Sequence, residues 1–298
     1  MFIKDLFLHK KLTISFELFP PKQSVSLDGI YNTIAELKEL NPDFISVTYG
    51  AGGSSKDRSI ELASAVKNKF GIETVAHLTC ITSTKREVKN TLDKLQENNI
   101  DNILALRGDI PKDFVLPENL EYNSSKDLIC ELAQRKGFCI SAAAYPEGYM
   151  GSMDIDREIK SLRDKVDCGA EVLITQLFFN NNSFYDFKEK LYKYNINTPV
   201  IAGVMPAVDR DLINRISWIS GASIPDRLKK LLDKYQYSPE SLLEAGTVYA
   251  SEQVSDLVAS GVEGIHLYTM NKSEIVKKIL KSVEEIRKSV NYKSVSSF

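Results

Sequence analysis

The sequence predicts an α/β protein in which eight parallel strands, each followed by a helix, close into one barrel. Short runs of β-branched or aromatic residues alternate with longer segments whose apolar residues recur at helical spacing, a pattern typical of a parallel sheet. The alternation repeats eight times. The length of 298 residues also suits a single (β/α)8 TIM barrel, a fold of roughly 250 residues. We therefore expect one domain over residues 1–298.

The expected elements follow one another in regular order. Strands are expected at 12–19, 44–49, 73–79, 102–107, 138–145, 171–177, 199–204 and 264–269. Their helices are expected at 27–40, 57–70, 84–98, 125–136, 154–168, 183–194, 209–220 and 272–290. Residues 224–260 form an extra helical insertion between the seventh and eighth strands, with Pro225 and Pro239 where helices begin.

Composition excludes several classes of function. Hydrophobic residues make up 43% of the chain, and 38 basic side chains balance 40 acidic ones, which indicates neither nucleic acid nor an anionic membrane as partner. The longest apolar runs are strand-sized, far below the roughly 20 residues of a membrane span. Without a cleavable leader, a cytoplasmic location is expected. The four cysteines lack metal or disulfide spacing and are expected to be reduced. A homo-oligomer is expected, with no predicted number of copies.

Polar side chains gather where the strands end, which is where barrels of this kind carry their reactive groups. In the first strand, period two places Glu17 on the face toward the barrel axis, where a carboxylate is costly unless used. The other strand ends present Thr48, Tyr49, His77, Arg107, Asp109, Tyr145, Gln176, Tyr268, Asn271 and Lys272. The sequence therefore predicts one polar site assembled from seven strand ends.

Some of these features have simpler interpretations. Arg107 and Asp109 can form a local ion pair in a turn. The glycine-rich stretch at 50–55 can hold phosphate at a helix start or serve only as a turn, and it has neither the dinucleotide-binding nor the P-loop spacing. His77 and Cys80 should face opposite sides, so no metal site is predicted.

Long motifs at these strand ends resemble the methylenetetrahydrofolate reductase family. They are SFELFPPK at 15–22, SVTYGAGG at 46–53, HLTC at 77–80, ALRGD at 105–109, AAYPE at 143–147, KVDCGA at 165–170, ITQ at 174–176 and YTMN at 268–271. The resemblance spans nearly the whole chain. The length is similar to that of the short bacterial type, which has the catalytic barrel without a regulatory domain.

The resemblance implies an enzyme in which bound FAD takes hydride from NADH or NADPH and passes it to 5,10-methylenetetrahydrofolate. The product, 5-methyltetrahydrofolate, would feed methionine synthesis. Glu17 would be the general acid that protonates the departing N10, and Asp109 would favour the cationic iminium and tune the flavin. The implied FAD-binding residues are Thr48, Tyr49, Ala51, His77, Arg107, Gly108, Asp109, Tyr145 and Lys165. Glu17, Asp109, Gln176 and Lys272 would contact substrate.

The sequence departs from the family pattern at three positions, and other functions stay open. Tyr149 stands where some relatives have histidine, Ile216 where some have an aromatic ring, and Lys272 where some have arginine, which leaves the local contacts open. A relative that receives electrons from a partner protein is the first alternative, and an NADH oxidation assay separates it. A folate-handling methyltransferase barrel and a non-catalytic flavin-binding subunit are the others.

Overall fold

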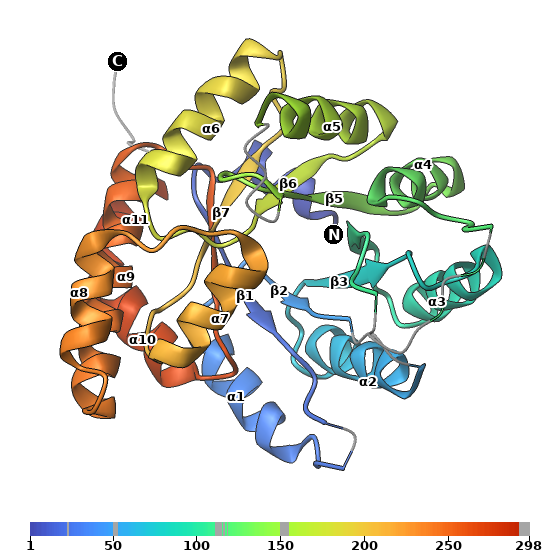
Figure 1. Cartoon of the computed structure of the whole chain (residues 1–298). Coiled ribbons are helices and arrows are strands. Elements are labelled where there is room, and N and C mark those ends of the chain that lie inside the picture. Colours follow the sequence, from blue (N-terminus) through green and yellow to red (C-terminus); the bar gives the residue numbers. More distant parts are fainter. Residues whose placement is uncertain are drawn as a thin grey trace, which may run out of the picture.

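Each strand of the barrel pairs in parallel with the next along the chain, and the last pairs with the first (Figure 1). The computed structural model describes residues 1–22, 24–49, 53–110, 115, 117, 119–149 and 155–291, with backbone alone at 53–55. The strands are β1 (Thr13–Leu18), β2 (Phe44–Val47), β3 (Thr74–Thr79), β4 (Asn102–Leu106), β5 (Cys139–Ala144), β6 (Val172–Thr175), β7 (Val200–Val204) and β8 (Gly264–Tyr268). All eight lie within the expected ranges, so the predicted barrel is confirmed.

Helices surround the barrel in the expected order. They are α1 (Asp28–Lys38), α2 (Gly53–Ser64), α3 (Lys85–Glu97), α4 (Ser125–Arg135), α5 (Ile155–Cys168), α6 (Asn181–Lys193), α7 (Arg210–Ser220), α8 (Asp226–Lys234), α9 (Pro239–Ala259), α10 (Ser273–Ser282) and α11 (Glu284–Asn291). The last expected helix is thus two helices, separated at the buried Val283. Within the described ranges, every helix is too short or too polar to span a bilayer.

The helical insertion expected at 224–260 is present as α8 and α9, which follow α7 between β7 and β8. Pro239 is the first residue of α9, and Pro225 is the residue just before α8. α9 lies against β7 and between α6 and α10, as an ordinary barrel helix does. A Cβ at Gly246 would run into the backbone carbonyl of Ala207, so α9 approaches the loop after β7 closely only because this residue is glycine. α9 therefore takes the place that was expected for the helix at 209–220, and the two extra helices are α7 and α8.

The apolar residues of β1 face away from the barrel axis, as period two predicts. Ile14, Phe16 and Leu18 pack in the layer between strands and helices, while Ser15 and Glu17 face inward. At the amino end of the barrel, the N-terminal 3-10 helix η1 (Ile3–Leu8) inserts Ile3 and Leu6 among the first residues of the strands. The inward-facing positions at the other end are therefore the ones available for a site.

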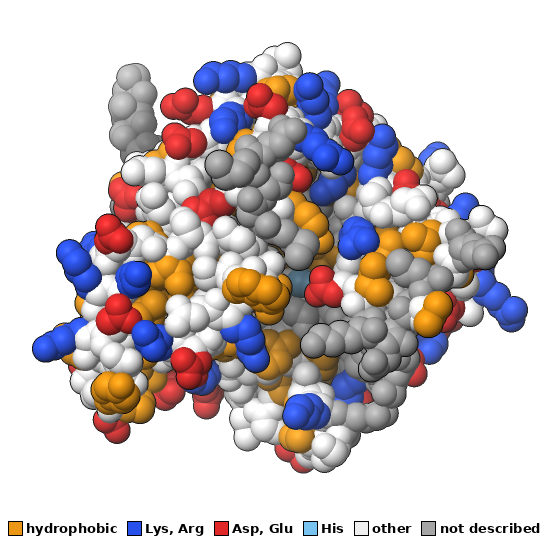
Figure 2. All heavy atoms as spheres, in the orientation of Figure 1, with side chains coloured by type: hydrophobic (Ala, Val, Ile, Leu, Met, Phe, Trp, Pro, Cys, Tyr) orange, Lys and Arg blue, Asp and Glu red, His pale blue; other side chains and the backbone are white. Residues whose placement is uncertain are grey.

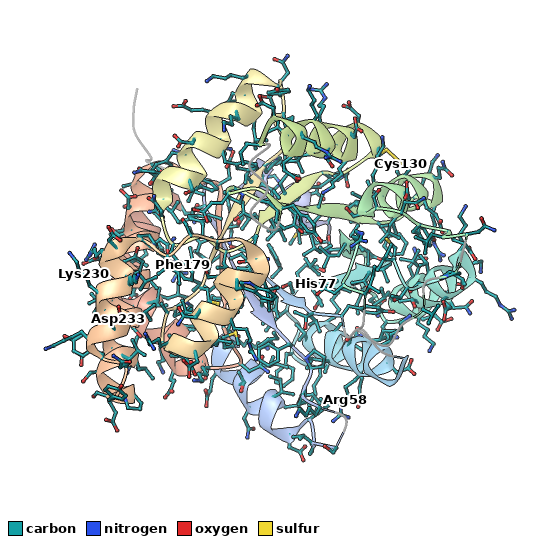
Figure 3. The ribbon with its side chains drawn as sticks, viewed as in Figure 1. Arg58, His77, Cys130, Phe179, Lys230 and Asp233 are labelled. Atoms are coloured by element: carbon teal, nitrogen blue, oxygen red, sulfur yellow. A yellow bond between two sulfur atoms is a disulfide. The ribbon has the colours of Figure 1, made fainter. Side chains whose placement is uncertain are left out.

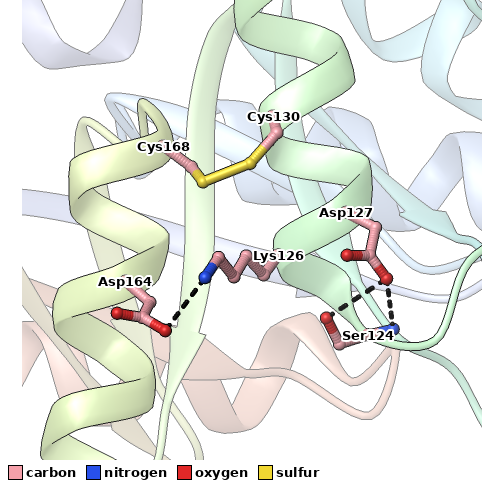
Figure 4. Close-up of a disulfide and its surroundings, with 6 residues drawn as sticks. All are labelled: Ser124, Lys126, Asp127, Cys130, Asp164 and Cys168. Atoms are coloured by element: carbon pink, nitrogen blue, oxygen red, sulfur yellow. Dashed lines mark hydrogen bonds and ion pairs between the residues drawn. A yellow bond between two sulfur atoms is a disulfide. The ribbon is translucent and has the colours of Figure 1, made fainter.

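The prediction that all four cysteines are reduced is wrong for one pair. Cys130 in α4 and Cys168 at the end of α5 form a disulfide (Figure 4). The barrel order makes α4 and α5 neighbours and brings the two Cα atoms to 4.9 Å, a separation that spacing along the chain does not reveal. Lys126 and Asp164 add an ion pair of 3.0 Å between the same helices. Cys80 and Cys139 are free and buried.

Candidate active site

A cavity of about 460 Å³ opens at the carboxyl ends of the strands, where the sequence predicts the site. Figure 2 shows a hollow on this face with a histidine at its bottom, and Figure 3 shows His77 in the middle of the barrel opening. The wall of the cavity includes most of the predicted residues, namely Glu17, Thr48, Tyr49, His77, Arg107, Gly108, Asp109, Tyr145, Gln176 and Tyr268. Small-molecule pockets have volumes of roughly 300–1,000 Å³. A second hollow, between α7 and α8, contains none of the predicted residues.

Glu17 lies on the floor of the cavity between two histidines. Its Oε2 is 3.6 Å from Nε2 of His77 on β3 and 3.7 Å from Nε2 of His266 on β8. The Glu17 side chain keeps 18% of its surface exposed, so it faces the cavity while most of it is enclosed. Beneath it, His266 Nδ1 is 2.8 Å from the Ser15 hydroxyl, and its Nε2 is 3.2 Å from the Ser46 hydroxyl. The carboxylate is thus held on a buried polar floor.

Sequence reasoning missed His266. The prediction considered where β8 ends, at Tyr268, and did not follow the inward face back along the strand. Period two places His266 and Tyr268 on the same face of β8, and the structure has both inside the barrel, with their rings 5.5 Å apart. The alternation of β8 was therefore a signal that could have found His266.

Burial keeps His77 neutral. Enclosure lowers the pKa of the His77 imidazole to about 4, since the low-dielectric surroundings disfavour its charged form more than the Glu17 carboxylate favours it. The contact between His77 and Glu17 is therefore no ion pair at neutral pH. Among the described residues, His77 Nε2 has no hydrogen-bond partner. This nitrogen is available to a group that enters the cavity.

The turn after β4 brings Arg107, Gly108 and Asp109 to the cavity wall. Gly108 has a φ of +83°, and a Cβ there would come within 2.7 Å of Cβ of Thr79, so the turn requires glycine. Within the described residues no ion pair joins Arg107 to Asp109, so the alternative interpretation as a local turn pair does not apply. Both side chains are therefore available to contact a ligand in the cavity.

Two tyrosines form the wall after β5. Tyr145 and Tyr149 meet edge to face, with ring centroids 5.0 Å apart. Burial raises the pKa of the Tyr145 hydroxyl, which therefore stays protonated. Tyr149, a departure from the family pattern, thus lines the cavity with an aromatic ring.

The remaining wall comes from β6, β7, β8 and α7. The Tyr268 hydroxyl donates to the carbonyl of Thr175 at 2.9 Å. The Tyr268 ring packs against Gly203, where a Cβ would lie 2.8 Å from the ring. Gln176 accepts a hydrogen bond from the backbone N–H of Leu177 at 2.9 Å and also faces the cavity. The apolar part of this wall includes Ile174, Leu177, Met205, Ile216, Ile219 and Met270. Of these, only Ile216 was considered from the sequence.

Three of the predicted residues that the structure describes do not line the cavity, namely Lys165, Lys272 and Asn271, whose side chain hydrogen-bonds to the backbone of Phe19. Lys165 is buried behind Tyr145, where its Nζ is 3.5 Å from the carbonyl of Ala143 and burial lowers the pKa of its amine. Lys272 is exposed at the residue before α10. Ala51 lies outside the described residues.

The described part of the chain brings together no group of three or more histidine, cysteine, aspartate or glutamate side chains suited to a metal ion. What the cavity does bring together is a carboxylate beside a neutral imidazole, an exposed aspartate, hydroxyl and amide groups, and a large apolar surface. Such a set can bind a flat, mostly apolar ring system and exchange a proton with it.

Comparison with known proteins agrees with this architecture. The chain matches the family model for methylenetetrahydrofolate reductase over residues 3–284. Methylenetetrahydrofolate reductase 1 of Schizosaccharomyces pombe is 36% identical over 289 residues, which cover 94% of this chain and 48% of that protein, so this chain spans about half of its length. The 5,10-methylenetetrahydrofolate reductase of Escherichia coli is 32% identical over 265 residues, covering 89% of this chain and 88% of that one.

A solved structure shares the fold over nearly the whole chain. It is an uncharacterized protein from Clostridium thermocellum that binds two copies of 5-methyl-5,6,7,8-tetrahydrofolic acid. The TM-score is 0.64 at 16% identity, covering 98% of this chain and 99% of that one, a likeness that concerns the fold alone. The family match and the relatives over most of the chain decide the family: the chain belongs to the methylenetetrahydrofolate reductase family.

Proposed function

We propose that the protein reduces 5,10-methylenetetrahydrofolate to 5-methyltetrahydrofolate, with NADH or NADPH as hydride donor and FAD as the bound carrier. The family supports the reaction, because the E. coli relative of nearly equal length carries the name of that activity. The observation that carries the proposal is the position of Glu17, a carboxylate on the floor of a ligand-sized cavity. The substrate must receive a proton as well as a hydride, and Glu17 is the group that can supply the proton.

The cavity fits a flavin. Leu104, Leu106 and Met205 give it apolar walls for a flat ring, and His77 Nε2 is a buried polar atom in need of a partner. The hydrogen-bonding edge of a flavin ring would supply a partner for His77 Nε2. The residues that would hold FAD are Thr48, Tyr49, His77, Arg107, Gly108 and Tyr145, with Ala51 and Lys165 as proposed outer contacts. FAD, when bound, would carry hydride between the nicotinamide and the folate.

Glu17 is the proposed general acid. When the imidazolidine ring of the substrate opens, N10 leaves with a pair of electrons and needs a proton. The Glu17 side chain keeps 18% of its surface exposed toward the cavity, so its carboxyl group is placed to transfer a proton to a ligand there. The hydroxyls of Ser15 and Ser46 fix the ring of His266, which lies 3.7 Å below the carboxylate.

Other side chains would orient and stabilise the substrate. Asp109, exposed at the mouth and unpaired with Arg107, supplies negative charge close to where the N5 iminium cation would develop. Gln176 offers an amide for hydrogen bonds to the folate ring or the nicotinamide. Lys272 stands outside the cavity, where its ammonium would attract the carboxylates of the folate glutamate tail without a bidentate grip.

Glu17→Gln tests the proposal. The variant should bind FAD and allow its reduction by NADH at the wild-type rate, but lose folate reduction by about 100-fold or more, the typical contribution of general acid catalysis. Rapid mixing measures the two half-reactions separately. Glu61→Gln on the exposed side of α2 is the matched control and should change neither. Equal loss of both half-reactions in Glu17→Gln would remove Glu17 from the acid role.

A further inference from the structure

We propose that Glu147 is a positioning residue that fixes the α7 wall of the cavity and thereby sets the affinity for the second substrate. The carboxylate lies in the loop after β5, between Tyr145 and Tyr149, which line one side of the cavity. It accepts hydrogen bonds from two other parts of the chain. One part is the start of α6, and the other is the segment that follows α7. The inference concerning substrate rests on the proposed function, whereas the anchoring of α7 does not.

Three hydrogen bonds converge on Glu147. Its Oε1 accepts from the hydroxyl of Ser223 at 2.6 Å and from the hydroxyl of Ser183 at 2.8 Å. Its Oε2 accepts from the backbone N–H of Ser223 at 2.8 Å. Two of the three bonds therefore hold Ser223, two residues beyond the Gly221 that ends α7. Hydrogen bonds to a charged acceptor are stronger than those between neutral groups.

The other buried contacts of α7 are few, chiefly those of Ile213, which shares an apolar cluster with Leu228 and Leu232 of α8, so an anchor at its end should matter for its position. The structure describes every residue of this helix, and Ile213 alone is buried. Trp218 is 85% exposed and Ile219 49% exposed. The ion pair of Arg210 with Asp233 in α8 is partly exposed and so contributes little. Figure 1 shows α7 on the side of the barrel across from α3 and α4.

The anchored helix faces the cavity. Ile216, Ile219 and Ser220 of α7 line it, opposite the turn that carries Arg107 and Asp109. Inside the helix end, Ser217 donates to the carbonyl of Ala222, and Ser220 donates to the carbonyl of Ile216, so the last turn and Ser223 form one connected unit. A displacement at Ser223 is therefore passed to the wall residues. Loss of the anchor should loosen the wall that a folate ring would contact.

Glu147→Ala is the discriminating variant, because it removes all three bonds. Glu147→Gln would not do so, since the amide oxygen can accept from the backbone N–H of Ser223 while the NH2 group donates to the two serine hydroxyls. Ser223→Ala removes one bond and keeps the backbone bond, so it should have a smaller effect. Ser183→Ala is the matched control, because it removes the one bond that goes to α6 and leaves both bonds to Ser223.

Two measurements test the proposal. In hydrogen exchange, the amides of residues 210–223 should exchange faster in Glu147→Ala than in the wild type, and at the wild-type rate in Ser183→Ala. Trp218, the one tryptophan of the chain, reports the same loosening through lower fluorescence anisotropy. In the reductase assay, Glu147→Ala should raise the KM for the folate about tenfold, the effect of one strong hydrogen bond. The kcat and the reduction of flavin by nicotinamide should change little.

Each outcome decides a different point. Unchanged exchange at 210–223 in Glu147→Ala overturns the anchoring role. Faster exchange with an unchanged KM for folate overturns the role in substrate affinity. An effect of Ser183→Ala as large as that of Glu147→Ala overturns the specific role of Ser223 and assigns Glu147 to general stability. If wild-type protein reduces no folate, the proposed function fails, and the exchange experiment still decides the anchor.

Discussion

The buried neutral imidazole of His77 should make the stability of the fold depend on pH. Folding lowers its pKa from the ordinary value of 6.5 to about 4, because burial disfavours the charged ring. Between these two values the unfolded chain binds a proton that the folded chain excludes. The contribution of His77 to the free energy of unfolding should therefore be fully present above pH 6.5 and should be lost as the pH is lowered toward 4.

The size of the effect follows from the two pKa values. Between pH 7.5 and pH 5, one group with these pKa values contributes a loss of about 2 kcal/mol. Urea unfolding followed by circular dichroism at each pH measures the free energy of unfolding directly. In His77→Gln, which cannot take up a proton, the loss over this interval should be smaller by that amount.

The matched control is His9→Gln, which changes an exposed histidine far from the barrel interior. It should leave the pH dependence of stability as it is in the wild type. If His77→Gln and the wild type lose stability in parallel between pH 7.5 and 5, the imidazole is not held neutral by burial. The description of the Glu17 environment would then have to be revised to include a charged histidine.

Two further predictions concern packing and the disulfide. Gly203→Ala places a Cβ 2.5 Å from the carbonyl oxygen of Thr175 and against the Tyr268 ring, so unfolding measurements should show a loss of about 1–3 kcal/mol. Gly29→Ala, where a Cβ meets nothing within 4 Å, should cost nothing, and equal losses would refute the steric argument. Reduction of Cys130–Cys168 should lower the free energy of unfolding by about 4 kcal/mol, the loop-entropy contribution for a sequence separation of 38. The double Cys→Ala variant should not respond to the reductant, and a wild type that is equally insensitive would contradict this prediction.

Most of the fold could be predicted because its strands and helices follow from local patterns in the sequence. Each strand and its helix carry their own hydrophobic period, so the eight repeats and the insertion after β7 could be recognised one at a time. The ends of the strands then placed Glu17, His77 and Asp109 around one cavity, since parallel strands of a barrel share a carboxyl edge.

The missed features depend on contacts between distant parts of the chain. The disulfide requires α4 and α5 to pack at a particular register, which sequence spacing does not contain. Ile219 and Met270 reach the cavity from a helix and a turn whose orientation is set by tertiary packing. The role of Glu147 depends on Ser223, which is 76 residues away in sequence. His266 is the exception, since the alternation of β8 did contain its signal.

The proposed reductase activity can be tested by following flavin absorbance near about 450 nm during anaerobic mixing of the purified protein, first with NADH and then with 5,10-methylenetetrahydrofolate. We expect the protein to retain flavin, NADH to bleach it, and the folate to restore the colour. Bound flavin that neither NADH nor NADPH bleaches would indicate electrons from a partner protein. A purified protein that binds no flavin, even when FAD is added, would contradict the proposed function.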